Sequence, residues 1–176
     1  MRFLPTPLDG LLVIETEPVS DERGHFARVW DAETFASVGL SGVIDQCCVS
    51  RNTIEGTLRG MHWQVAPHEE TKFVRCTRGR VFDVAVDVRE GSASRLSWWG
   101  TELDPITGRG LYIPPGFAHG FLTLENDSEV EYLMTSTYSP AHSRGLRYDD
   151  PSVGIVWPGP IRCVSESDLS FAPAVP

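Results

Sequence analysis

Short segments in which apolar and polar side chains alternate recur along most of the chain, and Gly, Pro, Asn and Asp residues separate them. Because successive side chains of a strand point to opposite faces, a period of two predicts β-strands. The pattern is clearest at 80–89, where Phe82 and three valines take one face while Asp83 and Asp87 fall on the other. On pattern alone, these two carboxylates either line a cavity or face water.

Regular spacing of such segments, with little helical pattern, is typical of an antiparallel sandwich or barrel. A roll of eight strands closes its own edges and encloses a cavity in which a ligand can sit. Asp31 is suited to cap a short helix that ends at Gly39. Turns at 148–151 and 157–160 indicate a C-terminal segment that packs across the barrel without forming a second core. We expect strands at 11–16, 25–30, 45–52, 57–64, 72–77, 80–89, 95–103, 110–113, 120–124 and 130–138.

The length and charge of the chain limit its functions. A chain of 176 residues with 41% hydrophobic residues suits one globular domain, 1–176, around one core. The net charge of −9 argues against general nucleic-acid binding, which needs a basic surface. A single phosphorylated ligand remains compatible with this charge, because a few local arginines are enough to hold it.

The sequence also predicts where the protein resides. No apolar stretch approaches the roughly 20 residues that span a bilayer, and no basic region followed by an apolar run opens the chain. The four cysteines, Cys47, Cys48, Cys76 and Cys163, form no CxxC pair. We therefore expect reduced thiols, no membrane association and a cytoplasmic location.

Two segments combine residues that carry chemistry. The first runs from Gly56 through five residues to His62 and continues to Gln64, and the second is Pro114-Pro-Gly-Phe-Ala-His119. Their spacing resembles the two halves of the cupin motif, which implies an all-β, cupin-type jelly-roll barrel with short peripheral helices.

Metal-binding cupins of this kind use His-x-His, a Glu and the later His as ligands. Here His62, Glu69 and His119 supply three such groups, while Gln64 replaces the second His. Three ligands are the minimum for a stable transition-metal site, so a metal-dependent enzyme is an alternative. The nearby cation of Lys72 argues against it.

Further motifs extend over most of the chain, from about Asp21 to Asp168. They are Asp21-Glu-Arg-Gly-x-Phe26, Gly56-Thr-Leu-Arg-Gly-Met-His-Trp-Gln64, Lys72-Phe-Val-Arg-Cys-x-Arg-Gly79, Phe82-Asp-Val-x-Val-Asp-x-Arg89, Gly116-Phe-Ala-His-Gly-Phe121, Glu131-Tyr132-Leu133, and Asp150-Pro151 with Trp157-Pro158. Together they resemble the dTDP-4-dehydrorhamnose 3,5-epimerase family. The resemblance implies an isomerase that acts on a nucleotide-activated 4-keto-6-deoxy sugar of the dTDP-4-dehydro-6-deoxyglucose type, uses no cofactor and no metal, and forms a homodimer.

The family's chemistry explains the residue types at the matching positions. Hydrogens at C3 and C5 of a 4-keto sugar are acidic, because the C4 carbonyl takes up the charge as an enolate. Inversion needs a base on one face, an acid on the other and a cation or donor for the enolate oxygen. The resemblance implies His62 as the base, Asp168 as its partner, Tyr132 as the acid and Lys72 as the cation.

The remaining matches are substrate contacts. The resemblance implies this role for Arg23, Phe26, Arg28, Gln46, Arg59, His119 and Tyr138. Arginine suits diphosphate, and Tyr138 matches a tyrosine that stacks on the nucleotide base. Three positions depart from the family: Arg28 often corresponds to Glu, Cys48 to Asn and Ser167 to Lys. These departures leave the nucleotide, the sugar and the choice between C3, C5 or both open.

A non-catalytic sugar-binding cupin is a further alternative. His25, His68 and His142 have no comparable neighbours and are interpreted as surface residues. From spacing alone, Tyr132 fits core packing as well as it fits catalysis. The combination of base, acid and enolate-stabilising cation favours an enzyme, because binding alone needs no such set.

Overall fold

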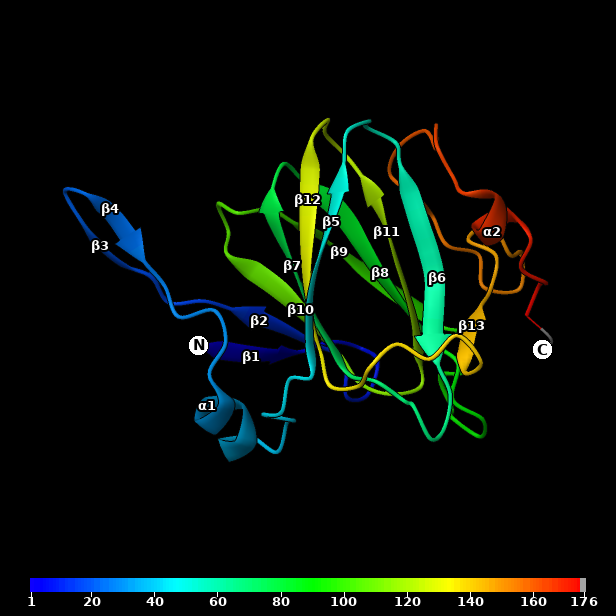
Figure 1. Ribbon diagram of the computed structural model, residues 1–176, viewed down its shortest axis with the longest axis horizontal. Coiled ribbons are helices and arrows are strands. Elements are labelled where there is room, and N and C mark those ends of the chain that lie inside the picture. Colours follow the sequence, from blue (N-terminus) through cyan, green and yellow to red (C-terminus); the bar gives the residue numbers. More distant parts are fainter. Residues whose placement is uncertain (175–176) are drawn as a thin grey trace.

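Two antiparallel sheets face each other in the computed structural model, which describes residues 1–174 (Figure 1). In sheet order, the first is β1 (Arg2–Pro5), β2 (Leu12–Glu15), β10 (Arg109–Ile113), β7 (Lys72–Arg78), β12 (Ser128–Met134) and β5 (Gln46–Asn52). The second is β13 (Ser143–Gly145), β6 (Leu58–Gln64), β11 (Phe117–Thr123), β8 (Val81–Asp87) and β9 (Trp98–Leu103). The prediction of an all-β, cupin-type jelly roll with short helices is confirmed.

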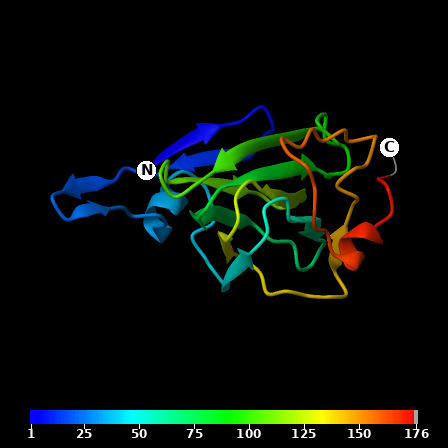
Figure 2. The same ribbon diagram turned by 90° about the horizontal axis from the view of Figure 1, so that it is seen from above.

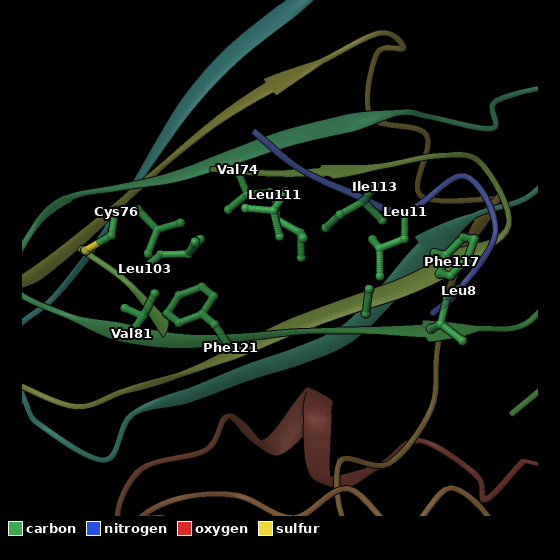
Figure 3. Packing of buried hydrophobic residues seen from close by; sticks show 13 residues of the cluster. Leu8, Leu11, Val74, Cys76, Val81, Leu103, Leu111, Ile113, Phe117 and Phe121 are labelled. Atoms are coloured by element: carbon green, nitrogen blue, oxygen red, sulfur yellow. The ribbon is translucent and has the colours of Figure 1, made fainter. Parts of the chain in front are cut away.

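The main core fills the space between the two sheets (Figure 3). Val74 and Leu111 from the first sheet meet Val81 and Phe121 from the second, and all four are almost completely buried. Burial of each such side chain stabilises the fold by about 1.5–3 kcal/mol. This packing holds the two sheets as fixed walls on either side of the cavity described below.

Strand β8 is buried on both faces, which decides whether its carboxylates line the interior or face water. Val84 and Val86 point outward and pack under Leu146 and Val153 of the C-terminal segment. The C-terminal segment thus packs across the barrel, as expected. The opposite face turns toward the inside of the sandwich, and Asp83 is completely buried there. The carboxylates of β8 therefore lie inside the protein and do not face water.

Strands β3 (Val19–Asp21) and β4 (Gly24–Phe26) form a separate two-stranded hairpin, here called the arm. It extends away from both sheets, at the end opposite α2 (Glu166–Leu169), and all of its strand residues are exposed (Figures 1 and 2). The predicted strand at 25–30 is wrong beyond Phe26. The chain leaves the arm there and enters α1 (Ala32–Ser37), which Asp31 caps through the backbone N–H of Thr34, as expected.

Other boundaries differ by a few residues. Strand β11 begins at Phe117 instead of 120, β9 begins at Trp98 instead of 95, and β12 ends at Met134 instead of 138. Strands β1, β3 and β13 and the helix α2 were not predicted. They span three or four residues each, which is too short for a period to be read from the sequence.

Within residues 1–174, the structure contains no helix with the length and apolar character that a membrane span requires.

Candidate active site

A cavity of about 560 Å³ opens between the two sheets and the C-terminal segment. Its walls come from β5, β7 and β12 of the first sheet and from β6 and β11 of the second. Most of the predicted site residues line it: Gln46, Arg59, His62, Lys72, His119, Tyr132, Tyr138 and Asp168. Residues more than a hundred positions apart in the sequence are thus brought to one cavity, because the C-terminal segment with α2 packs against β6.

His62 and Asp168 form a hydrogen-bonded pair. Nε2 of His62 on β6 lies 2.7 Å from Oδ1 of Asp168 on α2. Burial by itself would raise the pKa of Asp168, but the hydrogen bond and charge of His62 outweigh it and lower the pKa below its usual value. An ionised carboxylate only accepts hydrogen bonds, so Nε2 carries the hydrogen and Nδ1 of the neutral ring keeps its lone pair. This arrangement suits a base.

The backbone at Gly60 brings Asp168 to this histidine. Its N–H donates to Oδ2 of Asp168 at 3.2 Å, which fixes the second carboxylate oxygen. Gly60 has a φ of +126°, and a Cβ atom there would lie 2.6 Å from Cα of Gly120 on β11. Only glycine permits this close approach of β6 and β11. The close approach of the two strands thus explains why the Arg59-Gly60-Met61-His62 motif contains glycine at position 60.

Tyr132 stands on the opposite wall, on β12 of the first sheet. Burial raises the pKa of its hydroxyl strongly, the charge of Asp83 adds to this, and Arg59 opposes it. The phenol therefore keeps its proton at neutral pH, as a group that is to donate a proton must. The cavity thus has a base on one sheet and a protonated hydroxyl on the other.

His119 and Asp83 form a second, deeper pair. Nε2 of His119 lies 3.0 Å from both carboxylate oxygens of Asp83. Both side chains are buried, and the ring of His119 meets the ring of Tyr132 edge-on at 5.8 Å. His119 also pairs with His62 across β11 and β6. Asp83 thus fixes the orientation of a ring that contacts the proposed acid.

Lys72 enters the cavity from β7, next to β12. Its Nζ lies 3.0 Å from Oε1 of Glu70 and donates to the backbone carbonyl of His62 at 3.2 Å. Its side chain is only 9% exposed, so its ammonium group is held by protein groups and is largely shielded from solvent.

The outer part of the cavity presents groups for a longer ligand. The side chain of Tyr138 is at the rim, where the residue is 64% exposed, and its backbone N–H donates to Oε1 of Gln46. Arg59 is exposed, and its Nε donates to Oδ1 of Asn52 at 2.7 Å. That bond leaves the terminal nitrogens of the guanidinium as donors for an anion.

Comparison with known proteins decides the family. The sequence profile of the dTDP-4-dehydrorhamnose 3,5-epimerase family matches residues 5–174. The chain belongs to this family. The family predicted from the sequence is confirmed, and with it the class of isomerases to which the named members belong.

Individual members of the epimerase family are similar over nearly the whole chain. A dTDP-4-dehydrorhamnose 3,5-epimerase of Sinorhizobium fredii is 43% identical over 175 residues, 97% of this chain and 88% of that protein. A dTDP-4-dehydrorhamnose 3-epimerase of Streptomyces niveus is 36% identical over 159 residues, 90% of this chain and 76% of that protein. The Legionella pneumophila enzyme, solved with dTDP-4-keto-L-rhamnose, is 35% identical, with a TM-score of 0.91 over 97% of this chain and 90% of that one.

Three predicted site residues lie outside the cavity. Arg23 and Phe26 are on the arm, and Arg28 follows it. Arg23 pairs with Asp21, Phe26 is 75% exposed, and Arg28 lies 3.6 Å from Asp31. Within a single chain these three residues therefore do not reach the cavity that holds His62, because the arm leads away from the sheets around it, and their role as substrate contacts stays a prediction.

The metal-dependent alternative finds no support in the geometry. Glu69 is exposed and lines a different surface pocket, so it does not join His62 and His119. Across residues 1–174, the structure contains no group of three or more His, Cys, Asp or Glu side chains that could hold a metal ion.

Sequence reasoning missed three residues of the site. For Asp83 the sequence pattern was ambiguous, because its position in the alternating strand is compatible with a side chain in the cavity and with one in solvent. Glu70 is one of two adjacent glutamates that nothing in the sequence distinguishes. Phe171 meets the ring of His62 edge-on at 5.7 Å and packs over Gly145, where a Cβ atom would lie 2.3 Å from the ring. It lies in an irregular tail that has no periodic pattern.

Proposed function

We propose that the protein epimerises a nucleotide-activated 4-keto-6-deoxy sugar of the dTDP-4-dehydro-6-deoxyglucose type, at C3, C5 or both. The main support is the position of His62 with Asp168 on one wall of the cavity and of Tyr132 on the opposite wall. Inversion of a carbon centre requires removal of a proton from one face and delivery to the other. A base and an acid on facing sheets meet that requirement.

In the first step, Nδ1 of His62 takes the hydrogen from C3 or C5 as a proton. The electrons of the C–H bond form a carbon–carbon double bond to C4, and the C4 carbonyl becomes an enolate oxygen. Asp168 stabilises the imidazolium that results, since its carboxylate stays ionised beside the ring. The ammonium group of Lys72 stabilises the oxygen as its negative charge develops.

In the second step, the hydroxyl of Tyr132 gives its proton to the opposite face of the carbon, and the enolate returns to a ketone. The phenolate of Tyr132 then takes up a proton from solvent, and the imidazolium of His62 releases its proton to solvent. The protein ends as it began, with one stereocentre inverted and no net redox change. The reaction therefore needs no cofactor.

The nucleotide fits the outer part of the cavity. We assign the base to Tyr138, whose exposed ring at the rim is free to stack. Arg59 suits the diphosphate, and Gln46 holds the backbone of Tyr138. Both sheets and the C-terminal segment contribute to this one cavity, which supports a single epimerase domain over 1–176.

A homodimer explains the three residues that lie outside the cavity. Val19 and Phe26 face each other across the arm and are 74% and 75% exposed. An isolated two-stranded hairpin with an apolar surface is marginally stable in water and gains stability from a partner. We propose that the arm of one subunit reaches the cavity of the other and brings Arg23, Phe26 and Arg28 to the substrate there.

Complementation between two inactive variants tests this arrangement. We expect Arg23→Ala/Phe26→Ala and His62→Ala each to lose activity, and a 1:1 mixture that has exchanged subunits to recover about a quarter of the wild-type rate. Half of the dimers are then mixed, and each of these has one complete site. Activity of the mixture no higher than the mean of the two variants would show that the arm does not serve the partner's cavity.

Hydrogen exchange tests the reaction itself. The protein is incubated with dTDP-4-keto-6-deoxyglucose in heavy water with a chelator, and deuterium at C3 and C5 is followed by NMR. We expect deuterium at one or both positions. The labelled positions show which stereocentres the enzyme deprotonates. Exchange that requires added metal would support a metal-dependent cupin, and ligand binding without any exchange would support a binding protein.

We also propose a cytoplasmic location, in keeping with the four cysteines, all of which are free in the structure.

A further inference from the structure

Glu70 is a buried carboxylate in the cavity with no part in the mechanism above. Its side chain is 9% exposed and lines the cavity beside Lys72. Oε1 lies 3.0 Å from Nζ of Lys72, and Oε2 accepts a hydrogen bond from Nε2 of Gln64 at 3.1 Å. Both oxygens therefore have partners, and the charge of the carboxylate is balanced by the ammonium group of Lys72.

The ammonium group of Lys72 is held at two points. It contacts Glu70 and donates to the backbone carbonyl of His62. A lysine ammonium has three N–H donors on a flexible stem, so two fixed partners leave one donor free and restrict where it points. Desolvating both charges of a buried ion pair is expensive, so such a pair is weak evidence for stability. A role in orienting the lysine accounts for it better.

We propose that Glu70 is a positioning residue for the reaction, whose carboxylate holds the ammonium group of Lys72 where the enolate oxygen forms. This inference rests on the proposed function, in which Lys72 stabilises that oxygen. A donor fixed before the reaction stabilises the developing charge without having to reorganise during it. Glu70 acts through Lys72 and does not itself contact the substrate.

Gln64 keeps Glu70 in place. It occupies the position where a metal-binding cupin has its second histidine, and here its side chain is 3% exposed. Its Nε2 donates to Glu70, while its Oε1 accepts from the backbone N–H of Ser139 at 2.6 Å. The amide is thereby oriented from both ends. It links the carboxylate to the segment that carries Tyr138, so the reacting end and the nucleotide end of the cavity share one hydrogen-bond network.

Glu70→Gln tests the inference, with Glu69→Gln as the matched control. The two variants remove the same charge from neighbouring residues, but Glu69 is exposed at another pocket. In the deuterium-exchange assay we expect Glu70→Gln to lower kcat roughly 10- to 100-fold, the range for loss of one charged contact in a transition state, with KM changed less than about threefold. We expect Glu69→Gln to match the wild type.

Glu70→Asp separates charge from shape. Glutamine is the closer isostere, whereas aspartate keeps the negative charge on a shorter stem. The inference predicts a higher kcat for Glu70→Asp than for Glu70→Gln, and a steric role predicts the reverse order. In a Lys72→Met background, adding Glu70→Gln is expected to lower exchange no further, because a positioning residue acts only through the group that it positions.

Three results would overturn the inference: an unchanged or raised kcat in Glu70→Gln, a glutamine variant faster than the aspartate variant, or a further loss in the Lys72→Met background. Failure of the proposed function has a different signature. In that case the wild-type protein itself exchanges no hydrogen at C3 or C5.

Discussion

His62→Ala is expected to lower hydrogen exchange at C3 and C5 by about 10³-fold or more, a loss typical for removal of a general base. Two structural facts make this residue the base. Its Nε2 is committed to Asp168, which leaves Nδ1 with a lone pair, and its ring lines the cavity opposite Tyr132. The expected loss is in kcat, with little change in substrate affinity, because the ring acts on a proton and not on the nucleotide.

Deuterium uptake by the recovered sugar, read by NMR, measures this loss. His68→Ala is the matched control. The ring of His68 packs at a tilt against the ring of His142, outside the cavity. His68 contacts Gln64 only through its backbone carbonyl, which the substitution keeps. The melting temperature of His62→Ala is expected to fall, because the buried carboxylate of Asp168 loses its partner, so the assay is run at a temperature where the variant is still folded. Exchange at the wild-type rate in folded His62→Ala would remove His62 from the role of base.

The period-two pattern predicted most strands but not the environment of every side chain. In an exposed sheet, polar and apolar faces separate cleanly. Strand β8 is instead covered on both sides, by the core on one and by the C-terminal segment on the other. Asp83 is tolerated inside because His119 meets both of its oxygens. No local pattern contains that partner, which lies on the next strand of the sheet.

The site was predicted as residue types, and the structure adds how those residues are held. Asp168 illustrates the gap. An aspartate in a polar tail is usually solvated, yet here it is 4% exposed because α2 packs against β6 and Gly60 donates to it. Arg23 and Phe26 illustrate another limit. Their motif lies close to the other motifs in the sequence, but the arm points away from the cavity of its own chain. No local pattern shows whether such a hairpin serves the cavity of its own chain.

Tyr132→Phe is expected to uncouple exchange from inversion. Formation of the epimer should fall by about 100-fold, the lower part of the range for a general acid, while deuterium still enters the recovered sugar. The reason is that His62 remains able to remove the proton and to return one to the same face. Tyr148→Phe is the matched control, since it also removes a phenol hydroxyl but lies outside the residues that line the cavity.

The outcome depends on whether His62 exchanges its proton before it returns it. The ring is 42% exposed, and the carboxylate of Asp168 contacts Nε2 and not Nδ1, so exchange with solvent is open to Nδ1. Tyr132→Phe keeps the rest of the wall intact, because burial and the edge-on contact with His119 depend on the ring and not on the hydroxyl. We therefore expect labelled sugar with retained configuration. Epimer formed at the wild-type rate would show that another group delivers the proton, and absence of both label and epimer would show that Tyr132 is already needed for the first step.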